Sequence, residues 1–189
     1  MSRRDKLVSA LYASILAFII IEGLLLEVIF SGVFSPYEGL SKFFMGALIP
    51  IGVIAYIGYL GWLRDGRAIF KYVSLLALIL GSISIYRGVN GYWDALPILF
   101  IAYLTEVIVG PYLMKEFKEI DELSSKLFII GISIFVFSLP LVSISNTLAI
   151  IAFIGNLAKG IGLTKLLYHV FSLERVSSDV EILQASPSS

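Results

Sequence analysis

Long apolar runs separated by short polar connections dominate the hydrophobic pattern of this 189-residue chain. A helix needs an apolar run of about 20 residues to cross the hydrocarbon core of a bilayer. Backbone polar groups in lipid must be satisfied within their own segment, so each run is predicted to be a membrane-spanning helix. The runs cover residues 7–30, about 43–63, about 70–85, about 95–114, 127–144 and 147–171.

The pattern therefore predicts an all-α integral membrane protein, a compact six-transmembrane-helix bundle. The expected domains are a six-helix transmembrane domain over residues 1–172 and a flexible cytoplasmic tail over 173–189, which is rich in serine. The run at 70–85 is short for a full span. Small residues recur at helical spacing in five of the runs, which lets helix backbones approach closely in lipid.

The distribution of Lys and Arg predicts the orientation. Of 14 such residues, only Lys42 and Arg87 fall in the connections that would lie outside, and only Lys159 lies near the middle of a run. Cytoplasmic loops of membrane proteins carry an excess of Lys and Arg. We therefore expect a multi-pass protein of the cell (plasma) membrane with both termini on the cytoplasmic side.

The amino-acid composition excludes several kinds of cofactor and metal site. The chain is 58% hydrophobic and 15% charged, with a mean hydropathy of +0.94, whereas soluble domains are about 25% charged. It has no cysteine and a single histidine, so iron–sulfur clusters, thiolate metal sites and bis-histidine haem are excluded. No cofactor and no metal is predicted. The formal net charge is zero, which leaves the lipid bilayer as the expected partner and gives no basis for binding nucleic acid.

Glutamine and asparagine are scarce, while isoleucine is abundant. Gln occurs only at position 184, and Asn only at positions 90, 146 and 156. Proteins from thermophiles are poor in these thermolabile amides, so the composition is thermophile-like.

Four charged residues stand out in the predicted spans: Glu22, Glu27, Glu106 and Lys159. A charge at the bilayer centre costs about 2.5–3.5 kcal/mol on insertion scales, so such residues tend to face the bundle interior and find a partner. Lys159 has Asn156 one turn away, and either Glu106 or Glu22 is predicted to pair with it. Two acids and one base leave one carboxylate without a counter-charge.

Two hypotheses account for this set. The pair can serve only to fix the register of the helices, or it can be a proton or ion site in mid-membrane. Glu22 points more than about 100° away from the small face formed by Ala10, Ala13 and Ala17, given about 100° per residue. The helix at 7–30 therefore needs neighbours on two sides, and the second can be a cavity, lipid headgroups or another protein. Glu27 is a secondary candidate, close enough to the outer end to reach headgroups or water.

The leading functional hypothesis is a small polytopic transporter or membrane transport subunit, with Glu22 and Glu106 as proton or ion sites and Lys159 and Asn156 as their partners. The alternative is a non-catalytic, haem-free integral membrane subunit of a larger complex, such as a respiratory oxidase or dehydrogenase. Its partner subunits would contact residues 7–30. The lack of a histidine cluster or nucleophile motif favours a protein without catalytic activity of its own.

In size and number of spans, the chain resembles vitamin-uptake substrate-binding subunits, several small exporters and haem-free small subunits of respiratory membrane complexes. This resemblance implies no site residues.

Overall fold

The structure is a computed structural model that describes residues 1–32, 37–142 and 144–185, together with their side chains except those of residues 146 and 173–185. Within these residues, six helices are long and apolar enough to cross a membrane. This confirms the predicted all-α bundle of six transmembrane helices. The elements in order are α1 (Arg3–Ser31), α2 (Ser41–Trp62), α3 (Arg67–Val89), α4 (Ala95–Lys118), α5 (Glu122–Val142), the 3-10 helix η1 (Asn146–Leu148) and α6 (Ala149–Ala185).

Several helices extend beyond the predicted apolar runs. The run at 70–85 was expected to be short, yet α3 has 23 residues and includes charged residues at both ends. The charged segment between the fourth and fifth spans is mostly helical, because only residues 119–121 separate α4 from α5. The last helix continues to Ala185, beyond the predicted domain boundary at residue 172. The flexibility of the tail stays a prediction.

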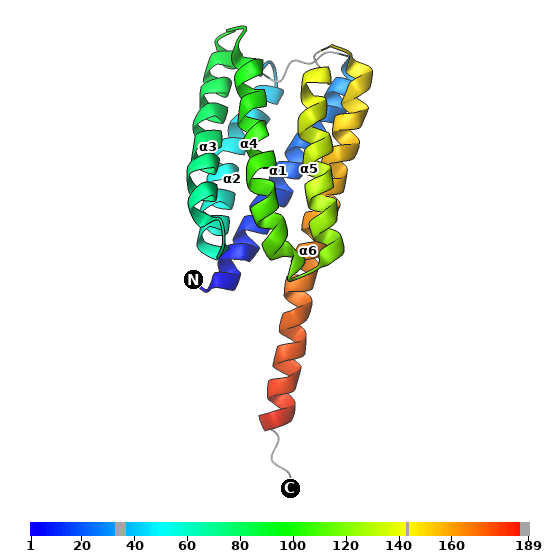
Figure 1. The fold of residues 1–189 in the computed structure, drawn as a ribbon. Helices are drawn as coiled ribbons and strands as arrows, with labels where there is room; N and C mark the ends of the chain where they lie inside the picture. Colours follow the sequence, from blue (N-terminus) through cyan, green and yellow to red (C-terminus); the bar gives the residue numbers. More distant parts are fainter. Residues whose placement is uncertain (33–36, 143, 186–189) are drawn as a thin grey trace.

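Each helix packs on its neighbours in sequence, and α6 closes the arrangement by packing on α1. The most extensive contact is between α5 and α6, while α2 and α3 pack most loosely among adjacent helices. The start of α1 and the end of α6 lie toward the same end of the bundle (Figure 1). That end is called the inner end below, and the opposite one the outer end; which of them faces the cytoplasm stays a prediction.

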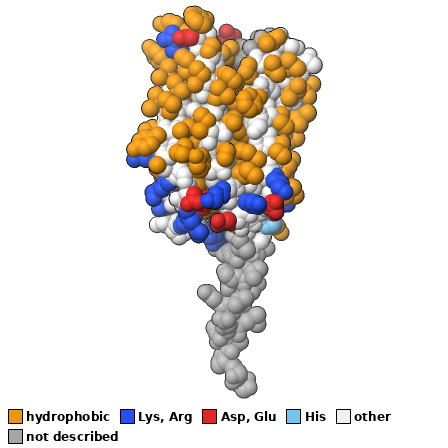
Figure 2. Space-filling model, in the orientation of Figure 1, with side chains coloured by type: hydrophobic (Ala, Val, Ile, Leu, Met, Phe, Trp, Pro, Cys, Tyr) orange, Lys and Arg blue, Asp and Glu red, His pale blue; other side chains and the backbone are white. Residues whose placement is uncertain are grey.

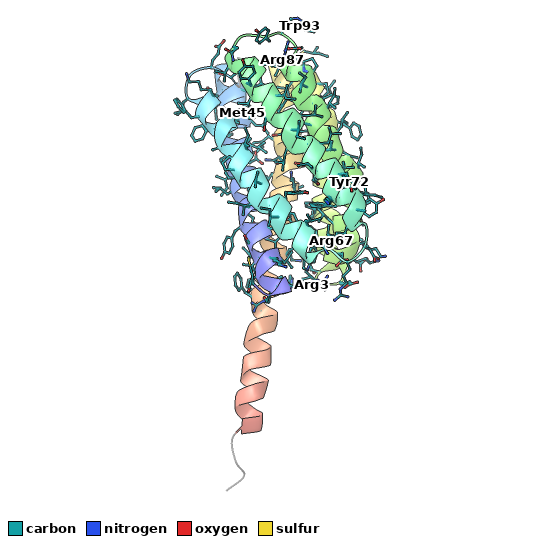
Figure 3. The ribbon with its side chains drawn as sticks, turned by 90° about the vertical axis from the view of Figure 1, so that its left-hand side faces the viewer. Arg3, Met45, Arg67, Tyr72, Arg87 and Trp93 are labelled. Atoms are coloured by element: carbon teal, nitrogen blue, oxygen red, sulfur yellow. The ribbon has the colours of Figure 1, made fainter. Side chains whose placement is uncertain are left out.

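The surface of the bundle has the polarity that a membrane demands. In Figure 2, hydrophobic side chains cover the middle of the visible face, and charged side chains gather in a band at the inner end. A smaller charged group lies at the outer end. Arg3 and Arg67 lie toward the inner end, and Arg87 and Trp93 at the outer end (Figure 3). An apolar belt between two polar ends matches a bilayer between two aqueous phases.

Glycine allows α5 and α6 to pack backbone against backbone. A Cβ atom on Gly131 of α5 would collide with the backbone of Lys159, and one on Gly155 of α6 would lie 2.5 Å from the backbone nitrogen of Phe135. Close approach through small residues is the usual packing of helices in lipid. The contact fixes the height of α6 against α5, and with it the position of Lys159.

A layer of aromatic side chains fills the inner end of the bundle. The ring centroids of Trp62 and Phe117 are 5.4 Å apart, those of Phe117 and Phe128 are 5.0 Å apart, and those of Tyr59 and Phe70 are 6.2 Å apart. All five side chains are buried. Because they come from α2, α3, α4 and α5, this aromatic layer joins four helices across the bundle.

Below the aromatic layer, a buried carboxylate holds three parts of the chain together. Glu116 Oε2 accepts a hydrogen bond from Arg3 Nη2 at 3.0 Å. Its Oε1 accepts from the backbone nitrogens of Arg64 at 2.9 Å and Asp65 at 3.2 Å. Arg3 also donates from Nε to the carbonyl of Trp62 at 2.7 Å. Glu116 thus anchors the N-terminus and the α2–α3 turn to α4.

A second carboxylate organises the α4–α5 turn. Asp121 accepts hydrogen bonds from the hydroxyl of Ser124 and from its backbone nitrogen, at 2.8 Å for the latter. Lys165 of α6 lies 3.5 Å away, and His169 lies 3.7 Å away. The Ser124 bonds, with the charge of Lys165, hold the pKa of Asp121 below its ordinary value of 3.8. This N-terminal cap ties the start of α5 to the inner half of α6.

Replacing Glu116 should therefore weaken the inner end. Glu116→Ala removes the acceptor of two backbone N–H groups and of Arg3, and leaving such donors unsatisfied costs about 1–3 kcal/mol. We expect a lower Tm by several degrees in detergent, measured by thermal unfolding. Glu116→Gln is the matched control, because its amide oxygen can still accept from the turn; it should lose less. Equal Tm values for Glu116→Ala and wild type would contradict the anchoring role.

Candidate functional site

An ion pair crosses the core of the bundle. Lys159 Nζ lies 2.6 Å from Oε2 of Glu106, so the structure joins Lys159 to one of the two partners that the sequence offered. The Lys159 side chain is 10% exposed and that of Glu106 is 33% exposed. Nζ also lies 5.8 Å from the ring centroid of Phe135. The ammonium group is thus held between a carboxylate and an aromatic face.

The ion pair lies near mid-membrane. Glu106 follows the start of α4, Ala95, by eleven residues, and Lys159 follows the start of α6, Ala149, by ten. At 1.5 Å per residue, both lie about 15 Å from the outer ends of their helices. A hydrocarbon core is about 30 Å thick. Neither side chain can therefore reach bulk water by extending toward a membrane surface.

A cavity of about 250 Å³ lies beside the ion pair, with residues of all six transmembrane helices in its wall. Glu106 and Lys159 are the charged residues among those that line it. The other lining side chains are mainly aliphatic or aromatic, with hydroxyl groups interspersed. The hydroxyl-bearing ones are Ser14, Tyr56, Tyr59, Ser74, Tyr103 and Thr105.

Part of the small face of α3 borders the cavity, while Ser84 of the same face is buried against the start of α4. Ser74, Ala77 and Gly81 of α3 line the cavity, and a Cβ atom on Gly81 would meet no atom within 4 Å. The loose contact between α2 and α3 leaves this space open. Tyr72, which lies outside this face, points away from the bundle (Figure 3), and its side chain is exposed.

The aromatic layer closes the inner end of the cavity. Tyr59, Phe70 and Phe128 belong both to that layer and to the cavity wall. The hydroxyl of Tyr59 forms a hydrogen bond of 3.0 Å with that of Ser14 on α1. Toward the outer end the wall continues through Met45 of α2, which Figure 3 shows in the outer half of the bundle.

The remaining predicted site residues lie outside the cavity wall. Glu22 of α1 is buried beside Asn156 of α6, and neither lines the cavity. The two sides of α1 are occupied by α2 and α6. Glu27 is exposed and accepts a hydrogen bond of 2.5 Å from Ser41 at the start of α2.

Sequence reasoning missed Glu116 and the aromatic layer. Glu116 stands in a segment rich in both acids and bases, a composition typical of a solvated loop. Glu116 follows the buried residues Val109 and Leu113 at helical spacing, which places it on the core-facing side of a continuing helix. Extending the helical period past the last apolar run would have identified it.

No protein-family model, curated protein or solved structure matches the chain. The fold and the site together define a multi-pass α-helical membrane protein with an ion pair in the wall of a core cavity.

Breaking the ion pair should be more harmful than removing it. Glu106→Gln or Lys159→Met leaves one charge without its partner, which costs about 3–5 kcal/mol when fully buried. Because a third of the Glu106 side chain is exposed, we expect about 1–3 kcal/mol, seen as a lower Tm in detergent. The double variant should recover most of the loss, since no charge is then left unpaired.

The exposed pair Glu122–Lys126, at 2.9 Å, supplies the control. Glu122→Gln and Lys126→Met should change stability by less than about 0.5 kcal/mol, because exposed i,i+4 pairs contribute little. If the single variants at Glu106 and Lys159 lowered Tm no more than these surface variants, the ion pair would contribute nothing measurable to stability.

Proposed function

We propose that the chain is a small transporter of the cell (plasma) membrane that moves an ion or a small charged solute through the cavity. Glu106 and Lys159 serve as the binding residues. The observation that carries the proposal is the ion pair itself, because it lies at mid-membrane depth in the wall of a cavity. A pair needed only to fix helix register gains nothing from an adjacent space.

The partial exposure of Glu106 supports a binding role. A solute in the cavity can reach this carboxylate without displacing a helix, because Glu106 lines the cavity and a third of its side chain is exposed. A cationic solute can then compete with Lys159 for Glu106, and an anionic one can compete with Glu106 for Lys159. The volume of about 250 Å³ lies just below the range of about 300–1,000 Å³ typical of ligand pockets, which favours a small solute.

The closed inner end supports alternating access. The aromatic layer separates the cavity from the inner surface, and the Glu116 cluster holds the N-terminus and the α2–α3 turn beneath it. Movement of α2 against α3 would open this layer, since the loosest contact between adjacent helices is that of α2 with α3. Excess Lys and Arg at this end is the basis for placing it in the cytoplasm.

The alternative of a non-catalytic subunit in a larger membrane complex stays a prediction. It was motivated by the need of residues 7–30 for a second neighbour. Within the described residues, α6 occupies that side of α1, so the helix is accommodated without another protein. Transport is therefore the function we favour.

Uptake into proteoliposomes tests the proposal. Three ring-sized probes of low passive permeability are used: benzyltrimethylammonium as cation, benzenesulfonate as anion and L-phenylalanine as zwitterion. We expect saturable uptake of one of them, lowered more than about tenfold by Glu106→Gln and by Lys159→Met, because a charged partner in such a site is worth more than about 1.4 kcal/mol. Glu27→Gln is the control and should behave like wild type. Equal uptake by wild-type and protein-free vesicles for all three probes would contradict transport.

Access to the cavity can be mapped with single cysteines, because the chain has none of its own. Ser74→Cys places a thiol in the cavity wall, while Ser138→Cys places one at a buried position of α5 outside the cavity. We expect a membrane-impermeant methanethiosulfonate to modify Ser74→Cys from the outer side, because the aromatic layer closes the inner end. Ser138→Cys should stay unmodified. A thiol at position 74 that resists the reagent from both sides would mean that no solute path reaches the cavity.

A further inference from the structure

A second polar contact lies between α1 and α6, next to the ion pair but outside the cavity wall. Glu22 is buried, with 8% of its surface exposed, and Asn156 is fully buried. The amide of Asn156 lies beside the carboxylate of Glu22. Its Nδ2 donates to the backbone carbonyl of Phe18, one turn earlier on α1, at 3.4 Å. This bond holds the amide against the turn of α1 that carries Glu22.

The contact has more buried acceptors than hydrogen-bond donors, because Asn156 Nδ2 donates to Phe18. Both carboxylate oxygens of Glu22 and Oδ1 of Asn156 are buried without a partner among the described residues. Buried polar atoms in native proteins nearly always have a partner, so three orphaned acceptors in one place indicate a missing donor. A proton on Glu22 supplies it: the carboxyl group becomes neutral, and its hydroxyl can donate to the vacant Oδ1.

The surroundings of Glu22 offer no charge to replace that proton. On α1 no charged residue lies between Lys6 and Glu22, and on α2 none lies between Lys42 and Arg64. Tyr59, the ionisable group of α2 that packs on α1, hydrogen-bonds to Ser14 about two turns away from Glu22. An isolated carboxylate in such an environment is strongly disfavoured.

On the other side of Glu22, α6 and the segment before it add one charge. Residues 144–158 carry none, and the first charged residue of α6 is Lys159. Its ammonium group is engaged with Glu106. Three oxygens are also too few for a divalent metal cation, since Ca²⁺ takes about six to eight oxygen ligands and Mg²⁺ about six.

Lys159 connects this contact with the cavity. It follows Asn156 by three residues, so both stand on one face of α6. Side chains on a helix lean toward its N-terminus, which brings the Lys159 ammonium toward the turn that holds Asn156. One face of α6 therefore carries both the base that pairs with Glu106 and, one turn away, the amide that lies beside Glu22.

We propose that Glu22 and Asn156 form a proton-binding site whose proton is exchanged for a cation at Glu106. In the state described, Glu22 holds the proton and Lys159 pairs with Glu106. When the O–H bond of Glu22 breaks, the proton passes to water and Lys159 turns to the new carboxylate. Glu106 is then free to bind one cation from the cavity, so the charge in the bundle is unchanged. This inference rests on the proposed transport function and makes the solute a cation.

Infrared spectroscopy of the full chain in lipid tests the proton site without any transport assay. We expect wild type near neutral pH to show the carbonyl band of a protonated carboxylic acid, which shifts in D2O. Glu22→Gln should lose this band, and Asn156→Leu should shift it because the hydrogen bond to Oδ1 is lost. Glu27→Gln is the matched control and should keep the band, because Glu27 is exposed and lies outside the contact. If a variant fails to fold, the absence of the band from the wild-type spectrum still overturns the proposal.

Three results would overturn the assignment. One is a wild-type spectrum with no protonated carboxyl band near neutral pH. Another is a band that persists in Glu22→Gln. The last is a wild-type band that disappears when Na⁺ replaces K⁺ in the buffer, because Glu22 would then bind sodium.

The exchange step is tested in proteoliposomes with benzyltrimethylammonium and an outward proton gradient. We expect wild type and Glu27→Gln to accumulate the probe, and Glu22→Gln to lose gradient-driven accumulation by about tenfold or more. Accumulation in Glu22→Gln equal to that of wild type would overturn the exchange. A Glu22-dependent infrared band without uptake of any probe supports the proton site and rejects transport. Uptake without the band supports transport and rejects the proton site.

Discussion

The position of Lys159 is the constraint on which the rest of the bundle depends. An ammonium group about 15 Å from either membrane surface cannot be solvated by water at those surfaces. It needs an anion within contact distance, and Glu106 of α4 provides it at 2.6 Å. The ring of Phe135 on α5 covers another side. Three helices therefore have to meet at one height around one charge.

Packing of α5 on α6 makes this meeting possible. Gly131 lies against the backbone of Lys159 itself, and no larger residue fits there. The helix that carries the charge is thereby fixed in height against α5, while α4 packs on the other side of α5. The carboxylate of Glu106 must then cross the space between α4 and α6, which do not pack closely on each other. The cavity lies beside this long-range pairing.

Much of this arrangement could be predicted from the sequence. The lengths of the apolar runs predicted the six spans, because membrane insertion depends on the hydrophobicity summed over a segment. Helix ends were predicted less well, since α4 and α5 continue through charged residues that lie outside lipid. The need of α1 for two neighbours also followed from the angle between Ala10 and Glu22. That its second neighbour is α6 of the same chain did not, because packing order is a tertiary property.

The choice between Glu22 and Glu106 shows where sequence reasoning stops. Glu22 lies nine residues from the outer end of α1, and Glu106 lies eleven residues from the outer end of α4. Both are thus at nearly the same depth, and either could reach Lys159. Small faces were equally ambiguous, since the one on α5 packs closely while Ser74 and Gly81 on α3 line the cavity. Which acid pairs with Lys159, and which small face packs closely, depends on which helices contact each other. The hydrophobic periodicity of a single segment does not predict those contacts.

Charge balance explains how Glu22, Glu106 and Lys159 can be buried together within a membrane. If both carboxylates were ionised beside one ammonium group, the core would carry a net negative charge in a medium of low dielectric constant. A single proton on the acid that Lys159 leaves unpaired removes that charge. Since Lys159 can neutralise only one carboxylate at a time, the other must hold a proton or a cation. Under the proposed exchange, the two acids are coupled through one lysine, and a change at either one alters what the other can bind.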